Sequence, residues 1–322
     1  MVICNAITDV AGIKVGHYTD ERAVTGCTVI LCERGAVAGV DVSGSSPGTR
    51  ETDLLRPGNL VDRVQAIVLG GGSAFGLDAA AGAMRYLEER GFGYETSAGR
   101  VPIVPAAIIF DLNIGDSKMR PGANESYQAC LTATGGKVAE GCVGAGTGAT
   151  VGKILGLERA VKSGLGSASQ EMAKDVVVAA LVVVNAVGDV IEPGTGKILA
   201  GPRKPDGSGF LSSSELWKGE FKEAVPPLNT VIGVVATDAK LSKAEANRLA
   251  RVAQVGIARA VDPCHTMYDG DVLFALSLGD KEADPNALGA AAAEVVTEAI
   301  VRAIEKAKTL AGVPAIKDVS KC

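Results

Sequence analysis

The sequence predicts an α/β protein, because short apolar runs alternate along it with longer helical patterns. Residues 66–69 are an apolar run typical of a strand, residues 70–73 are a glycine-rich turn, and residues 75–90 have a helical pattern. The 41 glycines and the low aromatic content of 4% indicate many tight turns and close backbone contacts. At 322 residues the chain is long enough for one large domain or two ordinary ones.

The second half of the chain continues this alternation. Residues 175–191 are too rich in β-branched side chains for a comfortable helix and break at 185–189, so they predict two strands about a turn. Amphipathic patterns at 243–261 and 285–310 predict two helices. Residues 197–223, rich in Gly, Ser, Pro and Lys, are the only linker-like stretch.

The composition excludes several classes of protein. A net charge of −5 without a Lys/Arg cluster argues against a nucleic-acid surface. Seven cysteines without a C-x-x-C pair indicate reduced thiols rather than a disulfide framework. The first residues show no secretory pattern, and the most apolar stretch, 176–184, is too short to span a bilayer. We therefore expect a cytoplasmic protein that binds neither nucleic acid nor membranes.

The most informative segment joins a proline-stiffened loop to a buried strand. Pro226 and Pro227 precede Asn229 and Thr230, which stand at the start of the apolar run 231–236. A hydroxyl in that position can attack the preceding carbonyl, and cleavage would give Thr230 a free α-amine that serves as its own base. An unperturbed α-amine has a pKa of about 7.7–8.0, which suits that role. Taken alone, however, Asn-Thr before a strand is common and indicates only a polar strand start.

Six motifs, spread over most of the chain, identify a family. They are ITDVAGIKVGH at 7–17, GSSPGTRET at 44–52, LGGGSAFGLD at 69–78, DLNIGD at 111–116, GCVGAGTG at 141–148 and VATDA at 235–239. In this order they resemble the self-processing L-aminopeptidase/D-esterase family, which includes β-peptidyl aminopeptidases and nylon-oligomer hydrolases. The resemblance implies a four-layer αββα sandwich of the N-terminal-nucleophile type, similar to that of ornithine acetyltransferases.

The resemblance also implies how the chain is organised. Residues 1–322 would be a single catalytic domain, cut between Asn229 and Thr230 into a large subunit, 1–229, and a small subunit, 230–322. The two fragments would stay associated, and the processed protomers would assemble as a homotetramer. The substrate would be a small amide or peptide, and no metal or organic cofactor is implied.

Two aspartates flank a glycine about forty residues after Thr230. Asp269 and Asp271 directly precede the apolar strand predicted at 272–278, so by themselves they indicate only an acidic turn. The Thr-type nylon-oligomer hydrolases carry a corresponding pair, whereas the Ser-type aminopeptidases have Ser and Glu there. A carboxylate beside the new ammonium would orient it and tune its pKa, and two close carboxylates could share a proton.

Three further positions are assigned by the resemblance. Asn185, at the end of a predicted strand, corresponds to an oxyanion-stabilising Asn, although alone it is a turn residue. Lys153 matches a lysine of the Thr-type members and would lower the pKa of the nucleophile if it were buried. Phe110 replaces an active-site Tyr and lacks its hydroxyl, for which Tyr127 and Tyr268 are possible substitutes.

Other motifs do not carry the function. Residues 44–48 match G-x-S-x-G, but Pro47 lacks the N–H that a nucleophile elbow needs after its serine. Residues 144–149 match G-x-G-x-x-A without a clear preceding strand, so nucleotide binding is not expected. The two histidines, His17 and His265, have neither metal-ligand spacing nor a convincing serine partner.

Two rival functions remain open. An acetyltransferase of the ornithine type shares the fold, although those proteins have Ala where this chain has Asn229. A relative that never processes would serve only as a binding scaffold. Among amide substrates, α-peptides, β-peptides, D-amino esters and aminohexanoate oligomers all stay possible. The preferred prediction is a self-processing amide hydrolase that acts on aminohexanoate oligomers or peptides.

Overall fold

A computed structural model of the protein describes residues 4–219 and 229–319. The predicted loop at Pro226 and Pro227 lies outside the described residues. The main sheet contains, in spatial order, β10 (Leu165–Glu171), β11 (Val177–Asn185), β14 (Thr230–Ala239), β16 (Val272–Lys281), β2 (Thr25–Val42), β4 (Arg63–Gly70), β7 (Ala106–Ile108) and β3 (Thr49–Arg50), with β1 (Lys14–Asp20) paired to β2. Neighbouring strands are antiparallel except for the parallel pairs β14–β16 and β4–β7.

The long strand β2 divides this sheet into two layers. Its residues 27–31 and 36–37 pair with β4, with a register shift between Leu31 and Ala36, whereas its residues 37–42 pair with β16. A central hydrophobic cluster lies between the layers and contains Ile67 of β4, Leu181 of β11 and Phe274 of β16. The predicted face-to-face packing is therefore confirmed, with both layers joined in one hydrogen-bonded sheet.

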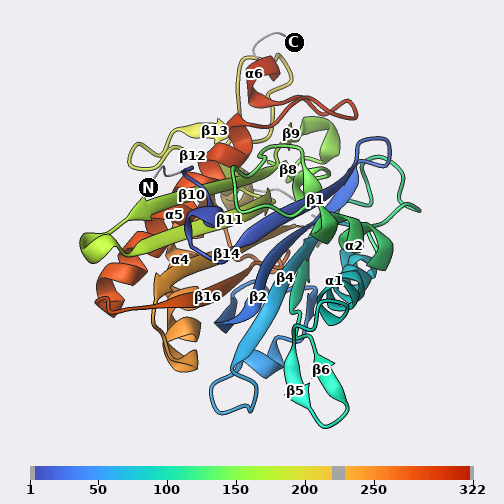
Figure 1. The fold of residues 1–322 in the computed structure, drawn as a ribbon. Helices are drawn as coiled ribbons and strands as arrows, with labels where there is room; N and C mark the ends of the chain where they lie inside the picture. Colours follow the sequence, from blue (N-terminus) through green and yellow to red (C-terminus); the bar gives the residue numbers. More distant parts are fainter. Residues whose placement is uncertain (1–3, 220–228, 320–322) are drawn as a thin grey trace.

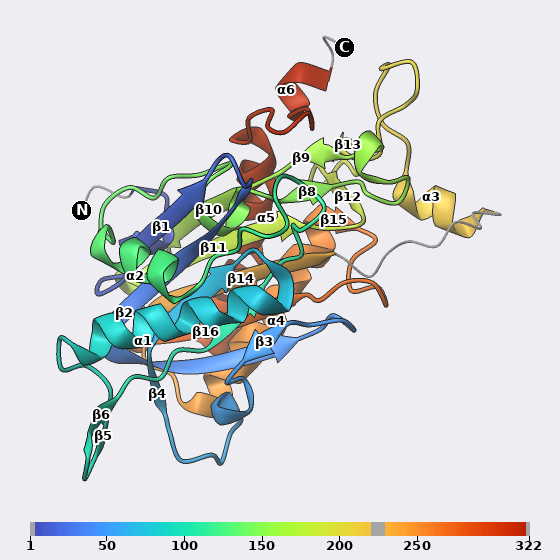
Figure 2. The ribbon, with the colours of Figure 1, turned by 90° about the vertical axis from the view of Figure 1, so that its right-hand side faces the viewer.

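Helices cover both outer faces (Figures 1 and 2). On one side α4 (Lys243–Ala260) and α5 (Pro285–Glu305) pack on β10, β11, β14 and β16. On the other side α1 (Ala79–Glu88) and α2 (Ala123–Leu131) pack against β1, β2 and β4. The order helix, sheet, sheet, helix confirms the αββα architecture.

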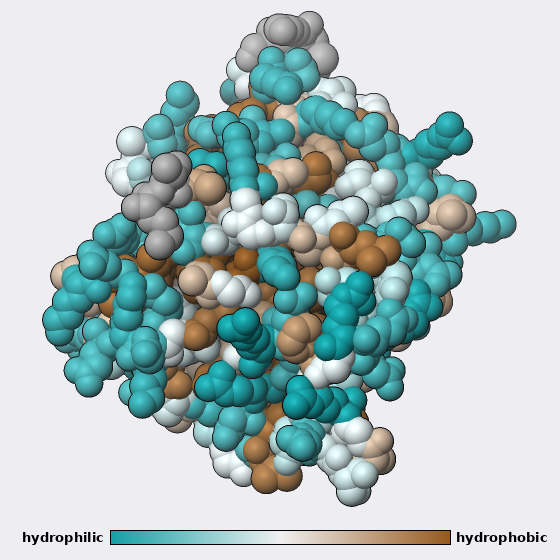
Figure 3. Space-filling view, in the orientation of Figure 1, coloured by the Kyte–Doolittle hydropathy of each residue, from teal (hydrophilic) through white to brown (hydrophobic). Residues whose placement is uncertain are grey.

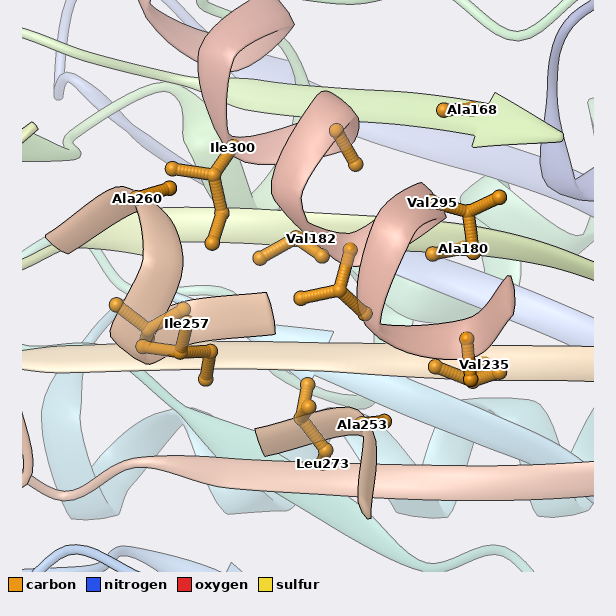
Figure 4. Close-up of a cluster of buried hydrophobic side chains, with 14 of the residues drawn as sticks. Ala168, Ala180, Val182, Val235, Ala253, Ile257, Ala260, Leu273, Val295 and Ile300 are labelled. Carbon is orange, nitrogen blue, oxygen red and sulfur yellow. The ribbon is translucent and has the colours of Figure 1, made fainter. Parts of the chain in front are cut away.

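The middle strands are apolar on both faces because each face meets a hydrophobic layer. Along β11, Leu181 and Val183 enter the central cluster, whereas Val182 and Val184 join the cluster beneath α5. Figure 4 shows Val182 near Val295 and Ile300 of α5. This two-sided burial explains why 176–184 is a continuous apolar run rather than an alternating one.

The smaller elements complete the chain. They are the sheet β12 (Asp189–Ile191), β13 (Ile198–Ala200) and β15 (Val261–Asp262), the hairpins β5 (Tyr94–Thr96) with β6 (Gly99–Val101) and β8 (Thr150–Val151) with β9 (Val161–Lys162), the helices α3 (Ser213–Lys218) and α6 (Ile316–Val319), and 3-10 turns at Ile7–Asp9, Asp53–Leu55, Ser73–Asp78, Gly144–Gly146, Leu157–Arg159 and Ala173–Asp175. Figure 3 shows hydrophilic residues over much of one face. Within the described ranges, none of the helices has the length and apolar character needed to cross a bilayer.

Most predicted elements are present, with three differences. The helix predicted at 75–90 begins only at Ala79, because a 3-10 turn precedes it. The strands on either side of 185–189 are β11 and β12, but β12 leaves the main sheet and pairs with β13 and β15. The linker prediction for 197–223 is wrong for its described part, which contains β13 and α3. The Asp189 carboxylate anchors α3 by accepting hydrogen bonds from the Ser213 amide and hydroxyl.

The close approach of α5 to β10 predicts a sensitive position. A Cβ added at Gly166 of β10 would lie 2.0 Å from the Ala299 carbonyl oxygen of α5. We expect Gly166→Ala to destabilise the fold by about 1–3 kcal/mol, the usual cost of overpacking, and so to lower the melting temperature by several degrees. Gly135→Ala is the control, because its nearest neighbour, the Ile13 carbonyl oxygen, is 3.5 Å away. Equal melting temperatures for the two variants would contradict this packing.

Candidate active site

Three strand ends meet at one edge of the main sheet. Thr230 begins β14 and pairs with Asn185, the last residue of β11, which runs antiparallel to it. Because β14 and β16 are parallel, both strands start at this same edge. Asp269 and Asp271 immediately precede β16, and an isolated bridge joins Asn229 to Asp269. The topology therefore gathers residues from distant parts of the sequence around Thr230.

The peptide bond between Asn229 and Thr230 is held on both sides. The Thr230 hydroxyl donates a hydrogen bond to the carbonyl oxygen of Asn229, so the hydroxyl lies against the group that it would attack. The Gly270 amide donates to the same oxygen at 2.8 Å, and the Asn229 amide donates to the Tyr268 carbonyl at 3.3 Å. Both Asn229 and Thr230 are buried. A buried carbonyl with a backbone donor on its oxygen is suited to nucleophilic attack.

Gly270 can approach this bond because it has no side chain. A Cβ at this position would lie 3.0 Å from the Thr230 hydroxyl and 2.4 Å from the Ser46 carbonyl oxygen. The Ser46 amide in turn donates to the Asp269 carbonyl at 2.9 Å, and the Gly44 amide donates to the Asp271 carbonyl at 3.1 Å. The segment containing Pro47 is thus a loop that clamps the Asp-Gly-Asp turn, not a nucleophile elbow.

Both carboxylate oxygens of Asp271 are engaged. Its Oδ1 accepts the Val231 amide at 2.6 Å, directly after Thr230. Its Oδ2 accepts the His265 amide at 3.1 Å and lies 2.8 Å from His265 Nδ1. Asp271 is only 1% exposed, so these donors replace its solvation. It ties the start of β14 to the loop before β16.

Asp269 is buried to the same extent but is less completely bonded. Its Oδ2 accepts both the amide and the hydroxyl of Thr266, at 3.0 and 2.6 Å. Its Oδ1 is buried and has no hydrogen-bond partner among the described residues. Burial raises the pKa of Asp269 to about 6 and the Asp271 charge adds to the rise, whereas the Thr266 hydrogen bonds and the Lys153 charge oppose it. This carboxyl can therefore exchange a proton near neutral pH.

Lys153 reaches the site from the segment after β8. Its ammonium donates to both the backbone and the side-chain oxygen of Asn185, each at 2.8 Å. Burial lowers the pKa of Lys153 to about 7, although the charge of Asp269 acts in the opposite direction. The Asn185 side-chain oxygen also accepts the Thr150 amide at 3.1 Å. These two donors fix which end of the Asn185 amide carries the nitrogen.

Phe110 enters the site through its backbone. Its carbonyl accepts the Asn185 side-chain nitrogen at 3.1 Å, so Asn185 bridges Lys153 and the segment after β7. Of the possible substitutes for a tyrosine hydroxyl at Phe110, Tyr127 donates instead to Glu89. Tyr268 flanks Asp269, and its ring stacks on Trp217.

The structure thus places all seven predicted residues in one connected region. Asp271 joins the region through the amide of Val231, the residue after Thr230. Hydrogen bonds or direct strand pairing link the other members: Phe110, Lys153, Asn185, Asn229, Thr230 and Asp269. Sequence reasoning missed the amide of Gly270 and the donors Thr266 and His265. The position of His265, six residues before Asp271, was the available signal. No group of three or more His, Cys, Asp or Glu in the described part of the chain is arranged to hold a metal ion.

A second buried lysine lies near this region. Lys162 is completely buried, and its ammonium donates to the carbonyls of Ala149 and Ser163 at 2.7 and 2.9 Å. Burial lowers its pKa to about 8. Its charge also faces the buried Asp111, whose pKa is raised by burial. Lys162 thereby ties the end of the glycine-rich segment 144–149 to β9.

Comparison with known proteins gives consistent matches. The model of peptidase family S58 matches residues 5–316. An uncharacterized aminopeptidase of Mycobacterium leprae is 43% identical, over 96% of this chain and 92% of the relative. A 6-aminohexanoate-oligomer endohydrolase of Agromyces sp. is 31% identical, over 92% of this chain and 84% of the relative.

A solved structure with a similar fold is the L-aminopeptidase D-Ala-esterase/amidase of Ochrobactrum anthropi. It has a TM-score of 0.73 at 23% identity, covering 97% of this chain and 88% of that one. That structure is described as a variant of the Ntn-hydrolase fold, in agreement with the layers described above.

The buried Lys153 predicts a pH-dependent stability. Its pKa is lowered in the folded state, so between about 7 and its usual value of 10.5 the unfolded chain binds more protons, and its contribution to stability rises with pH. Lys153→Met removes this contribution while filling similar space. We expect the variant to have a higher melting temperature than the wild type at pH 7, and the difference to shrink by pH 9. If the difference in melting temperature grew with pH, the lowered pKa of buried Lys153 would be contradicted.

Proposed function

Because this chain belongs to peptidase family S58 and is an amide or peptide hydrolase of the aminopeptidase type, we propose that it is a self-processing threonine hydrolase. It is made as a precursor, cuts its own bond between Asn229 and Thr230, and then uses Thr230 as the nucleophile. The contact between the Thr230 hydroxyl and the Asn229 carbonyl, with Gly270 as donor to the same oxygen, is the observation that carries this proposal.

Processing begins with attack of Thr230 Oγ1 on the Asn229 carbonyl carbon. The developing oxyanion is stabilised by the Gly270 amide, which already points at this oxygen. The hydroxyl proton passes to a nearby base, and the C–N bond then breaks as the Thr230 nitrogen takes up a proton. Asp269 and Lys153, with pKa values of about 6 and 7, are suited to move this proton at neutral pH. Water hydrolyses the resulting ester.

Turnover repeats this chemistry on an external amide. The acyl group of the substrate takes the place of Asn229, and its oxyanion meets the Gly270 amide and the Asn185 side chain. The α-amine of Thr230 accepts the hydroxyl proton and returns it to the leaving amine. The buried Asp269 Oδ1, which lacks a partner among the described residues of the uncut chain, provides an acceptor for the new ammonium.

The strand pairing supports continued association after cleavage. In the small subunit, β14 pairs along its length with β11 of the large subunit, from Thr230 opposite Asn185 to Thr237 opposite Val178. On the other side β16 of the small subunit pairs with β2 of the large subunit. The cut removes one peptide bond and none of these ladders, so residues 1–229 and 230–322 remain one folded domain.

Similarity favours hydrolysis over acyl transfer to ornithine. The family model and both relatives are peptidases or amide hydrolases by name. One of these relatives is named for 6-aminohexanoate oligomers. Thr230, Asp269, Asp271 and Lys153 are the residues that the sequence resemblance assigns to that subgroup. We therefore propose linear aminohexanoate oligomers as substrates, with short peptides as the alternative within the same mechanism.

Processing is tested on a denaturing gel. Purified protein should give two bands of about 23 and 9 kDa, dividing 32.6 kDa in proportion to residues 1–229 and 230–322. The smaller band should begin Thr-Val-Ile-Gly. Thr230→Ala should stay full-length because it has no hydroxyl, whereas Thr230→Ser should still be cut. An active wild-type preparation that remains uncut would show that this mechanism is wrong.

Substrate choice is tested by comparing two amide classes. The processed enzyme should hydrolyse a linear aminohexanoate trimer, followed by mass spectrometry, and uncut Thr230→Ala should not. An L-aminoacyl p-nitroanilide provides the comparison. Rapid release of p-nitroaniline with an untouched trimer would reject the oligomer as substrate and leave an aminopeptidase acting on α-peptides.

A further inference from the structure

His265 occupies an unusual place beside the nucleophile strand. It lies in the loop between β15 and β16, with a φ of 54° that few residues other than glycine adopt. This conformation directs both its backbone amide and its Nδ1 to the same oxygen of Asp271, at 3.1 and 2.8 Å. The other oxygen of Asp271 accepts the amide of Val231. A short chain of contacts therefore runs from His265 to the residue after Thr230.

The contact between His265 and Asp271 is an ion pair. The Asp271 side chain is 1% exposed and the His265 side chain is 24% exposed. Burial opposes the charge on His265, but hydrogen bonds and charges from Asp271 and Cys264 outweigh it and raise the His265 pKa to about 10. The imidazole is therefore an imidazolium at neutral pH, and it neutralises one of the two aspartates beside Thr230.

We propose that His265 is a positioning residue for the nucleophile: through Asp271 it fixes the start of β14 and leaves Asp269 as the carboxyl that exchanges protons with the α-amine of Thr230. The inference rests on the proposed function, because it assigns different tasks to the two aspartates of that site. The Asp-Gly-Asp motif alone specifies neither a histidine partner for Asp271 nor different roles for the two aspartates.

The hydrogen bonds around the two aspartates carry this division. Asp271 is held at both oxygens by three donors from His265 and Val231, so its position is fixed. Asp269 is held at one oxygen only, by Thr266, and its other oxygen has no partner among the described residues. A carboxyl with one uncommitted buried oxygen is the one able to receive the ammonium that cleavage creates.

Removing the imidazolium changes the charge at the nucleophile. The ionisable groups in this part of the site are Asp269 and Asp271 from the turn before β16, Lys153 from the segment after β8, Cys264 beside His265, and the α-amine of Thr230. Without His265 the net charge of this set becomes one unit more negative, which stabilises the ammonium form of Thr230. The pKa of the α-amine then rises, so the neutral amine that acts as base is populated only at higher pH.

His265→Asn is the decisive variant. Asn tolerates a positive φ and keeps a hydrogen-bond donor, but it carries no charge. We expect the acidic limb of the kcat/KM profile to move up by on the order of one pH unit, the effect of one charge several ångströms away at an effective dielectric constant of about 20. At pH values on the acidic limb, this shift corresponds to about a tenfold lower kcat/KM than that of the wild type. At high pH, kcat/KM should largely recover.

His17→Asn is the matched control, because His17 is the only other histidine of the sequence. Its Nδ1 lies 3.0 Å from the Thr28 hydroxyl, and burial lowers its pKa to about 4, so it is neutral at pH 7. This variant removes no charge at neutral pH, and its acidic limb should coincide with that of the wild type. A shift of equal size in both variants would overturn the proposal.

Histidine NMR on the processed wild type tests the ion pair without any substitution. With two histidines to assign, the His265 ring should stay doubly protonated at pH 8, and the His17 ring should be neutral at pH 7. A His265 ring that titrates near its usual value of 6.5 would overturn the proposal. So would an unshifted profile of folded His265→Asn in an active enzyme. A wild type that neither processes nor hydrolyses amides would instead reject the proposed function.

Discussion

The position of β14 between an antiparallel and a parallel neighbour governs the site. Because β11 ends where β14 and β16 begin, the last residue of one strand and the first residues of two others share an edge. A reversal of either strand would carry Asn185 or the Asp-Gly-Asp turn to the far end of the sheet. The remaining contacts, including the Gly270 amide on the Asn229 carbonyl, depend on this arrangement.

Burial of charged side chains is the second constraint on the site, because it changes their pKa values. The site withdraws Lys153, Asp269 and Asp271 from water, which moves the pKa values of Lys153 and Asp269 toward neutrality from opposite sides. Such burial costs stability, and the dense backbone hydrogen bonding around the turn offsets part of that cost. Groups that would be inert on the surface thereby become able to transfer protons at neutral pH.

The order of strands and helices and the positions of the candidate site residues could be predicted from the sequence. Local patterning places Thr230 and the two aspartates at the starts of strongly apolar strands, but only the resemblance assigned them a role in the reaction. Phe110 and Lys153 lie in irregular segments, and only resemblance pointed to them. The single sheet that bends into two layers at β2, and the turn of His265 toward Asp271, depend on long-range contacts and on a backbone conformation that composition does not encode.

The central claim is that Thr230 carries the acyl group during turnover. It is tested most directly by mixing processed enzyme with a slowly deacylated amino ester, quenching in acid and measuring intact masses and peptide fragments. The account predicts that the acyl mass appears on fragment 230–322 alone, at Thr230, and disappears as product forms. Acylation of fragment 1–229, or hydrolysis with no covalent intermediate under conditions that trap other acyl-enzymes, would contradict it.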